Sequence, residues 1–150
     1  MVIEETTGEP INSVTLRLRM ETIPAAGFVN VSLGRIRLKK GQVHDLGRVE
    51  FNSGIEIVVS VVDVSGQPLE GARVSCMDEE MWVCFSSGTT DEYGVAVVKS
   101  PFNTAGYIQV QVDDPATGLH ISGTISFQVG GEQDRGKEFM VPLTEVVAGL

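Results

Sequence analysis

The feature that most constrains this chain is a period-two alternation of apolar and polar residues, which recurs along most of its length. The clearest runs are VTLRLRM (14–20), RIRL (35–38), GRVEF (47–51), YIQVQV (107–112) and KEFMVPL (137–143). A helical period is nearly absent. Because side chains alternate between the two faces of a strand, and Gly, Pro, Asp and Asn separate the runs, the sequence predicts an antiparallel β-sandwich or barrel.

Composition limits the classes of function. A chain of 150 residues with 42% hydrophobic content is able to bury a core. Its net charge of −9 argues against binding to nucleic acids or adsorption to anionic membranes, both of which need a basic surface. The sequence contains no run of 18 apolar residues, so it predicts no transmembrane helix. The start, MVIEETTGEP, lacks the features of a signal peptide. We therefore expect either a protein that stays inside the cell, or a mature form or fragment of an exported one.

Two polar segments predict tight reversals between strands. The first is DVSGQPLEG (63–71), which follows the apolar run IEIVVSVV, and the second is TTDEYG (89–94). An Asp side chain can accept hydrogen bonds from its own turn, a Gly can take a positive φ, and a Pro fits a strand start or edge. These rules assign structural turn roles to Asp63, Gly66, Pro68, Gly71, Asp91 and Gly94.

An internal repeat predicts the domain organisation. Residues 35–51 (RIRLKKGQVHDLGRVEF) parallel residues 126–143, and residues 16–28 resemble residues 108–119. We therefore expect residues 1–53 to form the C-terminal half of one module, residues 54–144 a complete module, and residues 145–150 a tail. A half-module exposes unpaired edges, so it should pack on the next module or on a neighbour.

The stretch GIEIVVSVVDVSGQPLEGARV, followed by TTDEYGVAVV, resembles the carboxypeptidase regulatory-like domain, a prealbumin-like sandwich similar to Cna-B modules. The matching residues are Asp63, Gly66, Pro68, Leu69, Gly71, Ala72, Val74, Thr90, Asp91 and Gly94. The resemblance implies an antiparallel Ig-like or prealbumin-like β-sandwich, preceded by strands of a partial module. It departs from Cna-B modules in one respect, because VVSVVD (58–63) has no Lys for an isopeptide bond.

The resemblance also implies a class of function. Such modules act as stalks, spacers, adhesion elements or accessory domains of exported proteins, and they carry no catalysis. The expected function is a non-enzymatic structural or adhesive module at the cell surface or outside the cell. Its expected partners are neighbouring modules or other copies of itself. The alternative is a carbohydrate- or peptide-binding accessory domain, although aromatic content is only 6% and Trp82 lacks aromatic partners for a stacking platform.

No catalytic motif is visible. The only histidines are His44 and His120, and neither sits in a recognisable constellation. The segment GGEQDRG (130–136) is glycine-rich, but it is neither a P-loop nor a dinucleotide fingerprint, so it predicts a turn. We expect no enzyme activity and no cofactor.

Paired carboxylates leave one metal alternative open. Loop oxygens at Asp78, Glu79, Asp113 and Asp114 are of the kind that calcium prefers. No EF-hand spacing accompanies them, and acidic loop tips are commonly just solvated. No metal is the favoured prediction.

The segment ARVSCMDEEMWVCFS (72–86) predicts a hairpin centred near Glu80, in which Cys76 lies opposite Cys84. A cross-strand disulfide is possible in that register, and two buried thiols are the alternative. Because the family that this chain resembles is usually exported, the disulfide is favoured.

The same register makes both faces of the hairpin apolar. One face carries Val74, Cys76, Trp82 and Cys84, and the other carries Met77, Met81, Val83 and Phe85. The favoured interpretation is that the leading half-module covers the second face. The alternative is that the second face is an interaction surface for another subunit or module.

Overall fold

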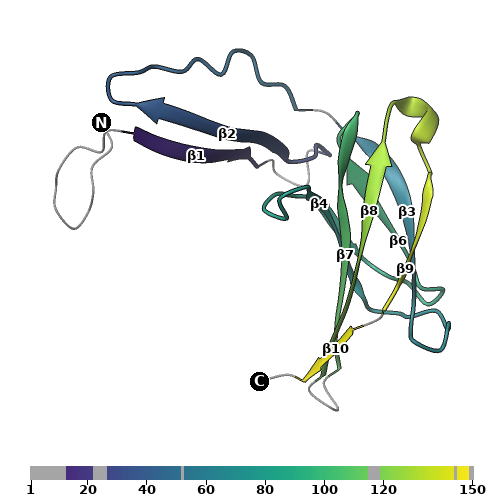
Figure 1. The fold of residues 1–150 in the computed structure, drawn as a ribbon. Helices are drawn as coiled ribbons and strands as arrows, with labels where there is room; N and C mark the ends of the chain where they lie inside the picture. Colours follow the sequence, from purple (N-terminus) through teal and green to yellow (C-terminus); the bar gives the residue numbers. More distant parts are fainter. Residues whose placement is uncertain (1–12, 22–26, 52, 115–118, 144, 149–150) are drawn as a thin grey trace.

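The computed structural model describes residues 13–21, 27–51, 53–114, 119–143 and 145–148 of the chain. Within these residues it contains ten strands and a 3-10 turn, so the predicted all-β fold class is confirmed. Figure 1 shows two parts: a two-layered body built by β3 to β10, and a long two-stranded arm that projects from one end of it.

The smaller layer of the body is a three-stranded sheet in the order β6-β3-β9. It consists of β3 (Ile55–Val62), β6 (Val95–Ser100) and β9 (Glu138–Pro142). β3 runs antiparallel to β6 but parallel to β9. The 3-10 turn η2 (Glu132–Asp134) precedes β9 and falls in the glycine-rich segment that was predicted to be a turn.

The larger layer is an antiparallel five-stranded sheet in the order β10-β8-β7-β4-β5. Its strands are β4 (Arg73–Asp78), β5 (Cys84–Thr89), β7 (Thr104–Asp114), β8 (Leu119–Val129) and β10 (Glu145–Ala148). The prediction of a tail over 145–150 is wrong for the described residues 145–148, because they pair with residues 119–122 of β8.

The core lies between the two sheets and follows the predicted alternation. Every second residue of β3 points inward and is fully buried, from Ile55 to Val61. The facing layer contributes Val74, Ile108 and Val110, which are also fully buried. All members of this core cluster lie between Ile55 and Leu143, so the body has a complete core of its own.

Asp63 and Asp91 shape the two predicted turns as expected. Asp63 Oδ1 accepts hydrogen bonds from the backbone N–H groups of Ser65 (2.8 Å) and Gln67 (3.0 Å), and the Ser65 hydroxyl also donates to it. These bonds, led by the one from the hydroxyl, lower the pKa of Asp63. Asp91 Oδ1 accepts from the backbone N–H groups of Tyr93 (2.9 Å) and Val95 (3.0 Å).

The remaining turn residues also take the predicted roles. Gly94 has a φ of +74°, and a Cβ there would lie 2.7 Å from the carbonyl oxygen of Val61, so only Gly fits. Gly66 and Gly71 also have positive φ values, and Pro68 forms an isolated bridge with Val62. Thr90 Oγ1 donates to the Leu69 carbonyl (2.6 Å) and accepts from the Ala72 N–H (2.9 Å), which ties the two motif segments together.

The arm consists of β1 (Ser13–Met20) and β2 (Val31–Lys39), which, among the residues that the structure describes, pair only with each other. Leu16 lies opposite Ile36, and the register shifts between Leu18 and Arg19. Residues 27–30, which we call the strap, attach β2 to the body. Val29 of the strap is 1% exposed, and the Asn30 N–H donates to the Phe85 carbonyl (3.3 Å).

Residues 43–51 run back from the arm tip to the body without regular structure (Figure 1). The run GRVEF within them was predicted to be a strand, by analogy with β9, and that prediction is wrong. β9 is held by its parallel pairing with β3, and residues 1–53 contain no segment that the repeat aligns with β3. Residues 43–51 therefore have no described neighbouring strand equivalent to β3, with which β9 pairs.

Candidate interaction surfaces

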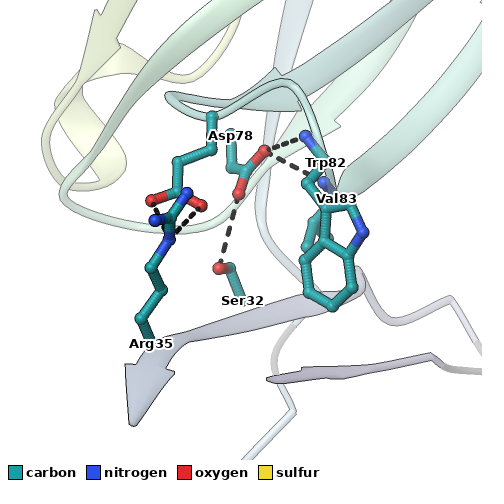
Figure 2. Close-up of polar contacts among 6 residues, drawn as sticks. Ser32, Arg35, Asp78, Trp82 and Val83 are labelled. Carbon is teal, nitrogen blue, oxygen red and sulfur yellow. Dashed lines mark hydrogen bonds and ion pairs between the residues drawn. The ribbon is translucent and has the colours of Figure 1, made fainter. Parts of the chain in front are cut away.

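The loop between β4 and β5 lies at the base of the arm and is organised by Asp78. Figure 2 shows its carboxylate between the loop and β2. Oδ1 accepts the N–H groups of Trp82 (2.7 Å) and Val83 (2.9 Å), and Oδ2 accepts the hydroxyl of Ser32 (3.5 Å). Asp78 is 8% exposed, so its desolvated charge depends on these donors. It therefore fixes a tight turn, in which Met81 has a φ of +57°.

Two further contacts fasten the arm to this loop. Arg35 of β2 forms an ion pair with Glu80 (3.1 Å), and the Arg19 guanidinium lies over the Trp82 ring, 5.2 Å from its centroid. The Arg35–Glu80 pair is exposed and worth at most about 1 kcal/mol. Trp82 is half-buried between this guanidinium and the core, so it does not present an open ring for stacking a sugar.

The four calcium candidates do not form a single site. Asp78 pairs with Gly106 near one end of β7 in register, whereas Asp113 lies at the other end. The Asp78 carboxylate is taken up by the turn, and Asp113 Oδ1 lies 2.6 Å from His120 Nδ1. Glu79 is exposed beside Asp78, and the side chain of Asp114 lies outside the described part. Among described residues, no three metal-binding side chains gather.

The predicted disulfide between Cys76 and Cys84 is wrong: both thiols are free. A bulge between Cys76 and Met77 shifts the register, so that Cys76 lies opposite Ser86 and Cys84 lies opposite Met77. Cys76 points into the core, where burial raises the pKa of its thiol to about 12. Burial also raises the pKa of Cys84. Cys76 fits the alternative of a buried thiol that acts as a small apolar group, whereas Cys84 is half-buried and its thiol donates to the Ser86 carbonyl (3.3 Å).

The same bulge corrects the predicted interaction surface on this hairpin. Val83 is 1% exposed and Phe85 is 6% exposed, because both point into the core of the body. Met77 is half-buried, and Met81 lies in the turn with 36% exposure. The strap runs beside β5, where Phe28, Val29 and Asn30 line a pocket together with Phe85, so the leading segment covers part of this region as the favoured interpretation expected. The four hairpin residues therefore do not make one surface.

An apolar surface that the sequence analysis missed lies on the outer side of the three-stranded sheet. We call it the valine face. Strand register places its residues side by side: Val58 lies opposite Val97, and Val62 lies opposite Pro142. Val97 is 53% exposed and Met140 is 64% exposed. The complete set is Val58, Val62, Val95, Val97, Met140 and Pro142, with Ser60 between them.

The outer side of the five-stranded sheet is mostly polar apart from Met77 and Tyr107, and we call its Ser, Thr and Gln residues the polar face. Ser75 lies opposite Ser87 and Gln109, which in turn lies opposite Thr124. The neighbouring rows add Gln111, Ser122 and Ser126. A sheet with one side in water is expected to look like this, whereas the valine face has the composition of a covered surface.

Charge divides the chain in the same way as the fold. Residues 13–51, which contain the arm, carry seven Lys and Arg against three Asp and Glu, a net charge of +4. Residues 53–143, which contain the body from β3 to β9, carry four Lys and Arg against thirteen Asp and Glu, a net charge of −9. The overall net charge, on which the exclusion of anionic partners was based, conceals a basic arm.

The two histidines lie apart from each other. His44 is exposed in the return segment, whereas His120 lies on β8 beside Asp113. The part of the chain that the structure describes contains no helix with the length and apolar character of a membrane span.

The comparisons with known proteins add no information about these surfaces. No protein-family model matches the chain, and no curated protein does.

Proposed function

We propose that this chain is a non-enzymatic assembly module of an exported or surface protein, of the carboxypeptidase regulatory-like type. The sandwich is its body, and the arm is the element that joins it to another copy. The observation that carries this proposal is the arm itself: a two-stranded sheet that projects from a body with a complete core (Figure 1).

The arm is poorly stabilised by the chain that carries it. A two-stranded sheet is marginal in water, and no further strand of the described residues pairs with either of its edges. Its apolar residues Leu16, Leu18, Ile36 and Leu38 are only partly buried. The contacts at its base hold one end, through the strap and the Asp78 loop, and leave the other end exposed. A partner that covers the apolar side would stabilise the arm.

The body, in contrast, has the properties of a spacer. Asp63, Asp91 and Thr90 satisfy the turn backbone internally, and the core is fully enclosed. A carbohydrate- or peptide-binding role remains the alternative prediction. No described residue favours it, because Trp82 lies under Arg19.

Light scattering after size exclusion tests the proposal, on the full chain and on residues 54–150. The shorter chain retains every residue of the core cluster. We expect the full chain to form assemblies that grow with concentration, and residues 54–150 to remain monomeric. A full chain that stays monomeric at all accessible concentrations contradicts the proposal.

A further inference from the structure

We infer that the valine face of one copy receives the apolar side of the arm of a second copy, with the arm tip lying toward the turns at 63–67 and 91–94. This inference rests on the proposed function, because it names the surface and the polarity of the contact between copies. Three observations lead to it.

The first observation is that both surfaces are apolar and neither is covered within the described chain. On the arm, the partly exposed apolar residues are Leu16, Leu18, Ile36 and Leu38, which alternate with Thr15 and charged residues. On the body, Val97 and Met140 are more than half exposed. The polar face shows that this chain places Ser, Thr and Gln where a sheet meets water. Burying the two apolar surfaces against each other removes both from solvent at once.

The second observation is a charge match that sets the direction of docking. The arm tip carries Arg37, Lys39 and Lys40, which are exposed and form no ion pair with described residues. At the end of the valine face where β3 stops and β6 starts lie Asp63, Asp91 and Glu92, with no Lys or Arg in residues 57–72 or 89–98.

The opposite end of the valine face is balanced in charge. Glu56 lies opposite Lys99 across β3 and β6, and Lys137 is adjacent in sequence to Glu138. A basic arm tip therefore gains most from the end with the turns.

The third observation is that an arm does not reach the valine face of its own copy. Its base is held at the loop between β4 and β5, and it extends away from β3, β6 and β9 (Figure 1). The contact must join two copies. Because the arm and the valine face are different surfaces, the contact is head-to-tail and repeats from copy to copy unless a ring closes.

Cross-linking between two mixed variants tests the location. One variant carries Ile36→Cys on the arm and the other carries Val97→Cys on the valine face, both with Cys84→Ser so that Cys76, buried in the core, is the only remaining native thiol. Mild oxidation of the mixture should join the two variants. The matched control replaces Val97→Cys by Thr124→Cys on the polar face, where we expect no product above background. An assembly that cross-links equally well through Thr124→Cys overturns the inference.

A charge exchange tests the polarity. The paired change Lys39→Glu with Lys40→Glu should weaken association about two- to fivefold or more, as expected for exposed ion pairs. Adding Glu92→Lys should restore it, whereas Glu138→Lys at the balanced end of the same face should not. Equal rescue by both, or by neither, overturns the inferred direction.

The two proposals fail differently. A full chain that remains monomeric by light scattering removes the proposed function and this inference with it. A chain that assembles but does not cross-link through Val97→Cys leaves the proposed function standing and removes only the valine face as the receiving surface.

Discussion

The arm and the body are built from the same kind of strand, yet only the body encloses a core. In β3 every second side chain is fully buried between two sheets. In β2 the corresponding alternation leaves Ile36 and Leu38 half-exposed, because no second sheet in the described part of the chain lies over them. Alternation therefore decides which side chains share a face, and the number of layers decides whether that face is buried.

Charge reinforces the difference. Residues 53–143, which contain most of the body, carry a net −9, and residues 13–51, which contain the arm, carry a net +4. Opposite signs on two parts of one chain weaken repulsion between copies that meet arm to body, and they oppose body-to-body contacts. The arm and the valine face thus complement each other in both hydropathy and charge.

The largest expected contrast comes from one substitution made in both regions. Ile57→Ala removes a fully buried side chain of β3 and should lower the free energy of unfolding by about 2–5 kcal/mol. Ile36→Ala in the arm should lower it by less than about 1 kcal/mol at concentrations where the chain is monomeric. Urea unfolding measured on both variants checks this. Equal losses would mean that the arm belongs to the cooperative core.

A second contrast uses two glycines with nearly the same backbone angle. Gly94 and Gly41 have φ values of +74° and +77°, but only Gly94 faces backbone within 4 Å, at the Val61 carbonyl. Gly41→Ala should cost about 1 kcal/mol locally, from the left-handed conformation alone. Gly94→Ala adds a clash and should cost about 2 kcal/mol or more.

Thermal unfolding of the two glycine variants measures this difference. The melting temperature of the body should fall for Gly94→Ala and remain near that of the parent chain for Gly41→Ala. A fall of similar size for both variants would mean that the arm tip unfolds cooperatively with the body.

A smaller effect reports on the body alone, through Cys76. Burial raises the pKa of this thiol from 9.0 to about 12, so the unfolded chain loses the proton at lower pH than the folded chain. The contribution is constant below pH 9, and stability falls as the pH rises from 9 toward 12. At pH 10 the loss should be on the order of 1 kcal/mol.

Urea midpoints at pH 8 and pH 10 under reducing conditions measure that loss. Cys76→Ala should show a shallower decline than the parent chain, although it is less stable at pH 8. An unchanged slope in Cys76→Ala would assign the decline to other groups.

Local patterns predicted much of the body. The roles of Asp63, Gly66, Asp91 and Gly94 depend on hydrogen bonds and backbone angles within a few residues, which is why their sequence spacing was sufficient. The all-β class followed from alternation for the same reason.

The features that were missed depend on pairing between distant residues. One bulge after Cys76 moved Cys84 away from it and turned Val83 and Phe85 inward, and no short-range signal marks a bulge at that point. Residues 47–51 alternate like a strand but have no partner of the kind that β3 gives to β9.

Two missed features did leave a signal in the sequence. In IEIVVSVV, the outward-facing positions 58 and 62 are also Val. A strand with one buried face needs apolar residues only at every second position, so these extra apolar residues indicated that the other face is apolar as well. The basic character of residues 13–51 is visible once charge is counted by region.

The measurement that tests the account most directly is amide hydrogen exchange of the full chain at low and high protein concentration. We predict that β1 and β2 exchange rapidly in dilute solution, while β3, β4 and β7 stay protected. At high concentration the arm strands should gain protection together with Val95–Ser100 of β6, as copies assemble. An arm that is as protected in dilute solution as β3, with no change on concentration, would contradict the claim that the arm depends on a second copy.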